Sequence, residues 1–362
     1  MRRNGSNLSQ KLNNLLFFLG GMLAVILVAI LVIGIQTKAQ NAGKSYDSSS
    51  NGDSGDSNIS ANTSSGELND DYEEKWQEGV ISYNGKNYKY NPNLKIYLIM
   101  GIDKEGAVTQ AEDGVSGGQS DAMFLLVVDA ENEQVKLISI NRNTMTKIAM
   151  YDKDGNEVGE TTAQICTQHG FGDGMKLSCS RTVTAVANLF YNLPIDGYFA
   201  LNMDGIGPLN DAIGGVEVEV LDDLDYPNRD VKLKKGDTVT LKGNEAYCYL
   251  RGRDINDFDS ATDRLRRQEQ YIVNFLNKLK SQSYGSAVLA EDMYSAVEDY
   301  LVTDLDFETL ADSLVDYDFS EDEMYTIPGK TSQGEEFEEF NVDEDEFYDM
   351  IINIFYNEVE EE

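Results

Sequence analysis

The sequence predicts an α/β fold with a mixed central sheet, and three observations support this fold class. Apolar side chains dominate three runs, KIYLIMGI at residues 95–102, AMFLLVVD at 122–129 and QVKLISIN at 134–141, which is typical of buried strands. A short polar turn joins the last two runs, so they are expected to form an antiparallel hairpin. Helical periodicity occurs at residues 182–193 and again after Ser260. Strands followed by helices in this order favour a sheet packed against helices.

The N-terminal part of the chain contains a candidate membrane anchor. Residues 15–35 lack any charged or strongly polar side chain, and such a run is long enough to cross a bilayer as a helix. Arg2, Arg3 and Lys11 precede the run without any acid, so the positive-inside rule places residues 1–14 in the cytoplasm and the rest of the chain outside the cell. A cleaved signal peptide is the alternative, but its apolar run is usually shorter. We therefore expect an uncleaved, single-pass anchor in the cell membrane.

The next segment is polar. Residues 36–75 are rich in Ser, Asn, Gly and Asp and contain too few apolar side chains to fold, which predicts a disordered stalk. The chain becomes apolar from Trp76, where Asn84 and Gly85 stand between alternating aromatic runs in ISYNGKNYKY. That pattern predicts a tight β-hairpin. We take residues 76–282 as the main folded domain.

Further elements follow the three long strands. The segments GYFALN, VEVEV, DTVTL and AYCYL are short and rich in strand-forming residues, so each is expected to form a strand. The helix at residues 182–193 is expected to stop before Pro194. Ser260 is a candidate N-cap for the second helix. The apolar stripe of that helix consists of Leu265, Ile272, Leu276 and Leu279.

The C-terminal part of the chain differs in composition. Residues 283–362 contain helical patterns at 290–300 and 307–315, and Lys330 is the only basic residue among them. This composition predicts an acidic helical extension with a solvated tail. We expect the extension to be accessory, so that a chain ending near Gln282 would keep the binding site.

Overall composition excludes several classes of function. A formal net charge of -35 and a pI near 4.2 argue against nucleic-acid binding, which needs a basic surface. The single histidine, His169, argues against a Ser-His-Asp triad or a histidine-rich metal site. Three cysteines do not make a disulfide scaffold. Cys166 and Cys179 flank one glycine-rich loop, and the sequence leaves open whether they form a disulfide or are two buried thiols.

Half of the ten arginines lie in one short stretch, between Arg251 and Arg267. Arginine is suited to bidentate contact with phosphate, so the stretch predicts an anion site. Arg251 and Arg253 alternate at strand spacing and are expected on one side of a strand, whereas Arg264, Arg267 and Gln268 share one face of a helix. The alternative is a set of weak surface salt bridges to nearby acids.

Two acids and one further arginine stand where predicted strands end. Asp103 follows the first strand and Asp121 precedes the second, on either side of a glycine-rich loop. Carboxylates near phosphate-binding arginines are what a Mg²⁺-phosphate site requires. The alternative is that both acids are ordinary turn residues, and spacing does not decide between the two. Arg142 follows the third strand, where a lone arginine is usually a surface residue.

Taken in order, these motifs resemble the LytR-CpsA-Psr family. The matching segments are MGID, SDAMFLLVVD, LISINRNT, LPIDGYFALNMDGIGPLNDAIGGVEVEV, LKKGDTVTLKGNEAYCYLRGRD and DRLRRQ. The ordered run is far more specific than any one motif, and it covers residues 93–279, about half of the chain. The predicted anchor, stalk and external domain match the layout of that family.

The resemblance implies both a fold and an activity. The fold is an α/β/α sandwich with a pocket for a polyprenyl tail. The activity is phosphotransfer, with Mg²⁺ as cofactor, of a glycopolymer such as teichoic acid or capsular polysaccharide from an undecaprenyl pyrophosphate carrier to peptidoglycan. One alternative is a weakly active or inactive protein that binds lipid-linked polymer. Another is a transcriptional attenuator, as the family was once labelled, but the acidic charge weighs against DNA binding.

The resemblance also implies roles for individual residues. Asp103 and Asp121 match the magnesium-associated acids of the family, and Arg142 matches the arginine that follows the hairpin. The positions that match the pyrophosphate-contacting set are Arg251, Arg253, Arg264 and Gln268, with Arg267 directly before that glutamine.

The chain departs from the family pattern in three places. Gln119 stands where the family usually has an arginine, and Asn143 stands where an aspartate usually follows the arginine. The segment QICTQHGFG replaces a KLNHAY-like segment, so His169 does not match the family histidine. We place Gln119 and Asn143 among the substrate-binding positions, together with Arg267 and Gln268. The lost arginine and the lost acid motivate the weakly active alternative.

Overall fold

The structure is a computed structural model. It describes residues 80–129, 131–132, 134–252, 260–282, 287–305, 321–335 and 337–360. The predicted anchor, the predicted stalk, the helical pattern at 307–315 and Arg253 all lie outside these ranges. Among the helices within the described ranges, none is both long and apolar enough to cross a membrane.

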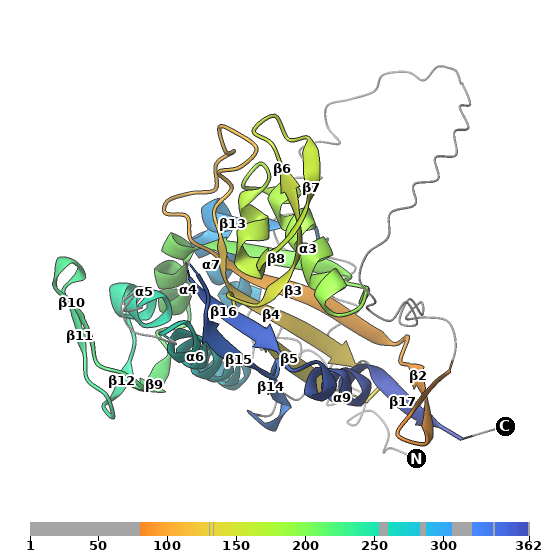
Figure 1. The fold of residues 1–362 in the computed structure, drawn as a ribbon. Helices are drawn as coiled ribbons and strands as arrows, with labels where there is room; N and C mark the ends of the chain where they lie inside the picture. Colours follow the sequence, from red (N-terminus) through yellow and green to blue (C-terminus); the bar gives the residue numbers. More distant parts are fainter. Residues whose placement is uncertain are drawn as a thin grey trace, which may run out of the picture.

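A six-stranded mixed sheet forms the centre of the molecule, with strand order β13-β8-β3-β4-β5-β14 (Figure 1). Its strands are β3 (Leu94–Ile102), β4 (Ser120–Asp129), β5 (Gln134–Ile140), β8 (Gly197–Asn202), β13 (Leu301–Thr303) and β14 (Met324–Thr326). β4 is antiparallel to β3 and β5, whereas β8 is parallel to β3 and β14 is parallel to β5. The predicted mixed sheet and the hairpin of β4 and β5 are therefore confirmed.

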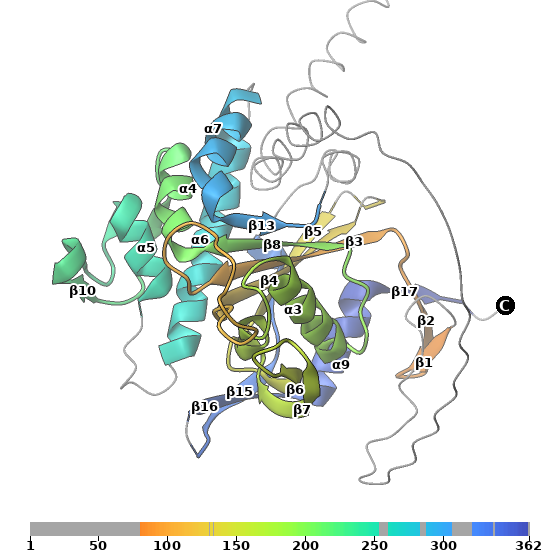
Figure 2. The same cartoon turned by 90° about the horizontal axis from the view of Figure 1, so that it is seen from above.

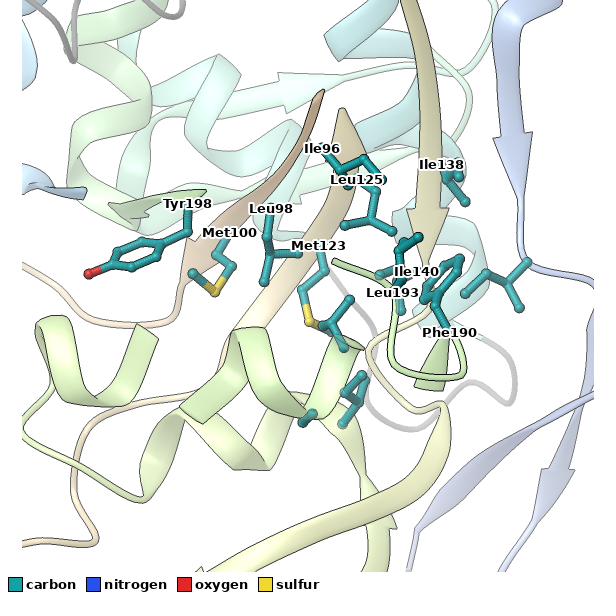
Figure 3. Packing of buried hydrophobic residues seen from close by; sticks show 14 of the residues in the cluster. Ile96, Leu98, Met100, Met123, Leu125, Ile138, Ile140, Phe190, Leu193 and Tyr198 are labelled. Atoms are coloured by element: carbon teal, nitrogen blue, oxygen red, sulfur yellow. The ribbon is translucent and has the colours of Figure 1, made fainter. Parts of the chain in front are cut away.

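Helices cover both faces of this sheet. Side chains alternate along β3, so Leu98 belongs to one core and its neighbour Tyr97 to the opposite one. The first core lies under α3 (Lys176–Leu189) and α9 (Glu344–Phe355), and the second lies under α6 (Ser260–Gln282). Figure 3 shows the first core, and Figure 2 shows α3 and α9 apart from α6. This arrangement is the expected α/β/α sandwich.

A helical region packs beside the sheet around a core of its own. It contains α4 (Ile206–Ala212), α5 (Gly243–Arg251), α7 (Ala287–Val297) and part of α6, with two small antiparallel ladders. One ladder pairs β9 (Glu217–Glu219) with β12 (Thr238–Thr240), and the other pairs β10 (Leu224–Tyr226) with β11 (Val231–Leu233).

One predicted strand in this region is wrong. The segment AYCYL at residues 246–250 lies in α5. The carboxylate of Glu245 accepts a hydrogen bond from the backbone N–H of Lys242 at 3.0 Å and closes the first turn of the helix. A short apolar run fits either a strand or a buried helix, and the cap together with tertiary packing decides for the helix here.

The remaining elements agree broadly with the sequence. The Asn84-Gly85 hairpin is present as β1 (Ile81–Tyr83) and β2 (Lys86–Tyr90), with both turn residues at positive φ. The helix predicted at residues 182–193 is α3, which begins and ends several residues earlier than expected. A second hairpin, β6 (Met145–Tyr151) and β7 (Glu157–Gln164), leads into the 3-10 helix η2 (Ile165–Gly170).

The C-terminal residues are part of the main domain, which corrects the expectation of a helical accessory extension. They supply β14 to the central sheet and β17 (Tyr356–Val359) to β2, and they form the hairpin of β15 (Gly329–Gln333) and β16 (Glu338–Val342). The apolar side chains of Phe347, Ile351 and Phe355 on α9 are buried in the first core, between the acids that dominate the composition. Burying each of them contributes roughly 1.5–3 kcal/mol. A chain ending near residue 282 is therefore expected to lose its fold.

Candidate functional site

Four charged and amide side chains from three parts of the sequence form a cluster at one end of β4. Asp121 forms ion pairs with two arginines. Arg142 Nε lies 3.1 Å from Asp121 Oδ1, and Arg264 Nη1 lies 2.9 Å from Asp121 Oδ2. The amide oxygen of Gln119 accepts a hydrogen bond from Arg142. We call Gln119, Asp121, Arg142 and Arg264 the Asp121 cluster. The strand β4, the turn after β5 and the first turns of α6 bring these residues together.

Asp103 lies beside this cluster because the loop after β3 is tied to the start of β4. Its Oδ1 accepts the backbone N–H of Gln119 at 2.6 Å, and its own N–H donates to the carbonyl of Gln119 at 2.9 Å. Gly118 has φ +86, and a Cβ there would lie 2.9 Å from Asp103 Oδ1, so this close approach requires glycine. Burial raises the pKa of Asp103 above its ordinary value, although the hydrogen bond from Gln119 opposes the shift.

The two acids fit a magnesium ion. Asp121 Oδ1 is buried and, within the described part of the chain, has no partner with hydrogen-bond geometry, but it lies 3.1 Å from Arg142 Nε, so a cation would share this oxygen with the arginine. Oxygen ligands from one or two carboxylates, completed by phosphate oxygens and water, are what Mg²⁺ prefers. Among the described residues there is no group of three or more His, Cys, Asp and Glu side chains placed to hold a metal. A bound substrate would therefore have to complete the coordination.

An apolar cavity of about 200 Å³ begins at the Asp121 cluster. It lies between one face of the sheet and the helices α4, α6 and α7, with walls that include Phe124, Leu209, Ile272 and Phe275. The charged and amide side chains that line it are Asp121, Arg251, Arg264 and Gln268. A cavity with hydrocarbon walls and guanidinium groups fits an amphipathic molecule with an apolar tail and an anionic head.

Arg251 lines this cavity, but from a helix and not from the strand that the sequence predicts. Arg251 is the last residue of α5, so the strand predicted at this residue is wrong, and Arg253 lies outside the described residues. The side chain of Arg251 is exposed, and the guanidinium carbon lies 5.6 Å from the centroid of the Tyr247 ring. Gln268 also lines the cavity and donates its side-chain amide to the Leu250 carbonyl at 3.1 Å, which joins α6 to α5.

The structure places Arg267 against α5 and outside the apolar cavity, and its predicted role in substrate binding stays a prediction. Its guanidinium is buried, lies 2.5 Å from Asp222 and donates to the carbonyls of Tyr249, at 3.0 Å, and Gly252. These carbonyls are at the C-terminal end of α5, where helices favour a cation. Because Arg267 is offset by one residue from Gln268 along α6, its side chain points in a different direction, toward α5. It therefore does not line the apolar cavity.

Asn143 is also turned away from the Asp121 cluster. It is buried, accepts a hydrogen bond from Gln164 at 3.0 Å and donates to Glu338 at 3.4 Å. These contacts join β7 and β16, so Asn143 supports the turn that carries Arg142, and its substrate contact stays a prediction. Arg266, in contrast, is exposed and paired with Asp263, as expected for a helix position outside the site.

A polar pocket of about 490 Å³ lies beside Asp103 and Gln119. Its lining is formed by Asp103, Lys104, Val115, Ser116, Gly118, Gln119, Thr167, Gly170 and Phe171. The sequence did not point to Ser116, Thr167 or Phe171. The available signal was the segment QICTQHGFG, where the chain departs from the family pattern and which forms η2 and one wall of the pocket.

The histidine and the cysteines support this region without being exposed. His169 is buried, with Nδ1 3.2 Å from the Gly118 carbonyl, and burial lowers its pKa to about 4, so the ring is neutral near pH 7. Cys166 and Cys179 are free thiols, which decides between the two alternatives that the sequence left open. Burial raises the pKa of Cys166, so the Sγ that lies 3.0 Å from Arg142 belongs to a neutral thiol.

The fold and this site define a member of a known family. The chain matches the LytR_cpsA_psr family over residues 56–353, and it belongs to that family. A relative, the polyisoprenyl-teichoic acid–peptidoglycan teichoic acid transferase TagU of Halalkalibacterium halodurans, is 30% identical over 212 residues. The alignment covers 58% of this chain and 61% of TagU, so the chain spans less than two thirds of that relative.

Two solved structures share the fold. Protein gbs0355 from Streptococcus agalactiae superposes with a TM-score of 0.58 and 20% identity, covering 72% of this chain and 86% of that one. TagV of B. subtilis superposes with a TM-score of 0.55 and 23% identity, covering 73% of this chain and 96% of TagV. The α/β/α sandwich expected from the resemblance is therefore the fold of this family.

Proposed function

We propose that the chain is a phosphotransferase that moves a teichoic-acid-type glycopolymer from a polyprenyl pyrophosphate carrier to peptidoglycan. The observation that carries this proposal is the apolar cavity that begins at the Asp121 cluster. A polyprenyl pyrophosphate needs a hydrocarbon site and a cationic site in direct contact, and this geometry provides both. The name of the relative TagU supports teichoic acid as the polymer and peptidoglycan as the acceptor. Capsular polysaccharide is a second polymer class that would use the same carrier chemistry.

The residues of the site would have separate roles toward the pyrophosphate. Arg142, Arg251 and Arg264 would bind its oxygens, and Arg253, which lies outside the described residues, would join them by the family pattern. Asp103 and Asp121 would hold Mg²⁺, which supplies positive charge next to the phosphates when it is bound. The undecaprenyl chain would lie in the apolar cavity.

The proposed reaction is a single displacement at phosphorus. A hydroxyl oxygen of the acceptor forms a bond to the phosphorus that carries the glycan. The bond from this phosphorus to the bridging oxygen breaks, and its electron pair leaves with polyprenyl phosphate. The hydroxyl proton passes to water. Positioning and electrostatic stabilisation account for most of the catalysis in phosphoryl transfer, so fixed arginines next to a fixed tail are the main requirement.

We further propose that the protein is a single-pass membrane protein with its N-terminus in the cytoplasm and this site outside the cell. The support is the apolar run at residues 15–35 with its preceding basic residues. Protease added to intact cells is expected to release the folded domain. Protection of the domain until the membrane is opened would contradict this orientation.

A binding protein with little or no activity is the second candidate. It is favoured by Gln119, whose neutral amide faces Arg142 at the position where the family usually has an arginine. The pyrophosphate would then meet one cation fewer, which reduces stabilisation of the charge on the leaving phosphate. Both candidates need the same cavity and the same arginines for the donor, so only turnover separates them.

Release of polyprenyl phosphate by the full-length chain in detergent tests the proposal. The donor is a polyprenyl pyrophosphate-linked disaccharide, and the acceptor is a soluble peptidoglycan glycan, with and without Mg²⁺. We expect Mg²⁺-dependent release that Arg264→Ala reduces strongly and Arg266→Ala retains, because Arg264 belongs to the Asp121 cluster and Arg266 does not. Donor binding without release by the unmodified chain would establish the binding protein instead.

A further inference from the structure

We propose that the polar pocket binds the saccharide of the acceptor glycan and that Phe171 provides the surface on which a sugar ring stacks. This inference rests on the proposed phosphotransferase function. It extends that function to a pocket formed by η2 and the loop between β3 and β4.

The polar pocket and the apolar cavity share no lining residue, and each is lined by members of one chain of contacts. Asp103 binds the backbone N–H of Gln119, the side chain of Gln119 contacts Arg142, and Arg142 is paired with Asp121. Asp103 and Gln119 line the polar pocket, whereas Asp121 lines the apolar cavity. This chain of contacts therefore connects the two cavities.

The chemistry of displacement at phosphorus assigns the two sides. The attacking oxygen and the leaving oxygen lie roughly in line, with the reacting phosphorus between them. The leaving oxygen belongs to the polyprenyl phosphate, whose tail would fill the apolar cavity. The attacking hydroxyl must then approach from outside that cavity, and we assign this approach to the polar pocket, which adjoins the charged residues without sharing a lining residue with the cavity. The first sugar of the donor is attached to the same phosphorus but lies off this line, so the geometry favours the acceptor.

The walls of the pocket have the groups that bind carbohydrate. Ser116 offers a hydroxyl, and Thr167 offers the lone pairs of a hydroxyl whose proton is donated to the Gln164 carbonyl at 2.7 Å. Gln119 adds the N–H groups of its amide and Asp103 its second carboxylate oxygen, and all of these groups can form hydrogen bonds with sugar hydroxyls. Phe171 adds an aromatic face, against which the C–H face of a sugar ring packs. The volume of about 490 Å³ is within the range of ligand pockets, which is roughly 300–1,000 Å³.

The aromatic wall is held in place before any ligand arrives. Arg181 donates to the carbonyl of Phe171 at 3.1 Å, and its guanidinium lies 3.3 Å from the centroid of the Tyr151 ring. The rings of Tyr151 and Phe171 are 6.3 Å apart between centroids. A ring fixed in this way loses little conformational entropy on binding, so its contact area contributes more fully to affinity.

The loop that faces Phe171 across the pocket is equally fixed. The backbone N–H of Gly117 donates to the Gly170 carbonyl at 2.9 Å, and a Cβ on Gly117 would lie 2.5 Å from the His169 carbonyl oxygen. The His169 ring contacts the carbonyl of Gly118. These contacts tie the loop before β4 to η2, so the two walls keep their separation.

The test compares two substrates in the transfer assay of the full-length chain. The acceptor probe is a β-1,4-linked tetramer of N-acetylglucosamine, and the donor is the polyprenyl pyrophosphate-linked disaccharide. Phe171→Ala is expected to lower kcat/KM for the acceptor by about tenfold, mainly through KM, because a stacking contact is lost. The KM for the donor should stay the same. Phe171→Tyr, which keeps the ring, should restore the acceptor KM.

Thr167→Val and Phe337→Ala complete the design. Thr167→Val is nearly isosteric and removes one hydroxyl from the pocket, so it should raise the acceptor KM severalfold even if Phe171→Ala fails to fold. Phe337 is an exposed aromatic residue, 47% accessible, that does not line either cavity, so Phe337→Ala should leave both KM values unchanged.

Four outcomes are distinguishable. The inference is supported if Phe171→Ala and Thr167→Val raise the acceptor KM, leave the donor KM unchanged, and Phe337→Ala changes neither value. A donor KM raised by these variants, with the acceptor KM unchanged, would place the donor sugar in the pocket and overturn it, and so would two unchanged KM values. If the unmodified chain releases no polyprenyl phosphate, the proposed function fails, and direct binding of the tetramer to the unmodified chain and to Thr167→Val then decides the inference on its own.

Discussion

The two cavities are joined by one chain of contacts, from Asp103 through Gln119 and Arg142 to Asp121, but their walls differ in chemistry. The apolar cavity is lined by the sheet and by residues of α4, α5, α6 and α7, and its polar groups are mainly the charged and amide side chains near the Asp121 cluster. The polar pocket is lined by loops and by η2, with hydroxyl, amide and carboxylate groups around one aromatic ring. Because the walls differ, the molecule can hold a hydrocarbon and a sugar at one charged centre without either site having to tolerate the other ligand.

The origin of the difference lies in local structure. Alternation along β3 and β4 places apolar side chains such as Phe124 and Leu126 on one face of the sheet, and α6 covers this face. The polar pocket is built instead from turns whose glycines allow close backbone contact, as at Gly117 and Gly118. Regular elements make the rigid apolar wall, and tightly packed loops make the polar one.

Removing the shared carboxylate is expected to have the largest effect. Asp121→Asn would leave the half-buried Arg142 and the buried Arg264 without their common anion, since both pair with it in the described structure. Breaking a buried ion pair costs about 3–5 kcal/mol of unfolding free energy. Transfer activity should also disappear, because both arginines lose their orientation. Urea denaturation measures the first effect and polyprenyl phosphate release the second.

Asp263→Asn is the control for that variant. Asp263 pairs with the exposed Arg266 on the surface of α6, and such pairs contribute only about 0–1 kcal/mol. Equal loss of stability in Asp121→Asn and Asp263→Asn would show that the Asp121 cluster is not the charged centre between the cavities.

Two buried arginines on α6 are expected to differ in what their loss does. Arg264→Ala removes a phosphate-facing cation from the apolar cavity and should lower transfer by about 2–3 kcal/mol, roughly 30–150-fold, per folded molecule. Arg267→Ala should destabilise the protein by at least about 2 kcal/mol, because Asp222 and two carbonyls lose their donor. Its folded fraction should keep the donor KM, because Arg267 does not line the cavity.

The measurement is activity normalised to the folded fraction at each denaturant concentration. A donor KM raised equally by Arg264→Ala and Arg267→Ala would mean that both arginines contact the pyrophosphate, as the sequence predicts, and that the two side chains do not have separate roles.

The pH dependence of stability tests the wall of the polar pocket. The pKa of His169 is about 4 in the folded protein and about 6.5 when unfolded, so the unfolded chain binds more protons between these values. Stability should therefore fall as the pH falls from 6.5 to 4. Between pH 7 and pH 5, titration of His169 should lower the free energy of unfolding by about 2 kcal/mol.

His169→Gln isolates that contribution, because other acids titrate in the same range and remain in both proteins. The variant should be less stable than the unmodified protein at pH 7 but should lose less stability on acidification to pH 5. Identical slopes in the two proteins would show that His169 is not held neutral by burial.

Much of the fold is accessible from the sequence because its signals are local. The long strands, the Asn84-Gly85 turn and the start of the helix at Ser260 are specified by apolar runs, turn residues and a cap. The strand predicted at residues 246–250 is wrong because its pattern is ambiguous without the packing of α5. The acidic composition of the C-terminal residues conceals the apolar positions of α9, so composition alone predicts an appendage where the structure has part of the core.

The site is predictable only in part. Motifs identify Asp121, Arg142 and Arg264, and the structure brings them together. Arg264 and Arg267 differ in role because Arg264 reaches Asp121 on β4, whereas Arg267 reaches Asp222 and the end of α5. Residue spacing along the sequence does not reveal these neighbours. The polar pocket escapes prediction because its residues come from loops with no periodic pattern, far apart in the sequence.

Photochemical labelling of the lipid site would show which of the two cavities holds the hydrocarbon tail. A polyprenyl pyrophosphate analogue with a diazirine at the far end of its tail is bound to the full-length chain, irradiated and mapped by mass spectrometry. We expect labels on peptides from α4 and α6 that contain Leu209 and Ile272, which line the apolar cavity. Labels on the peptide that contains Thr167 and Phe171 would place the lipid in the polar pocket and contradict the proposed division between the cavities.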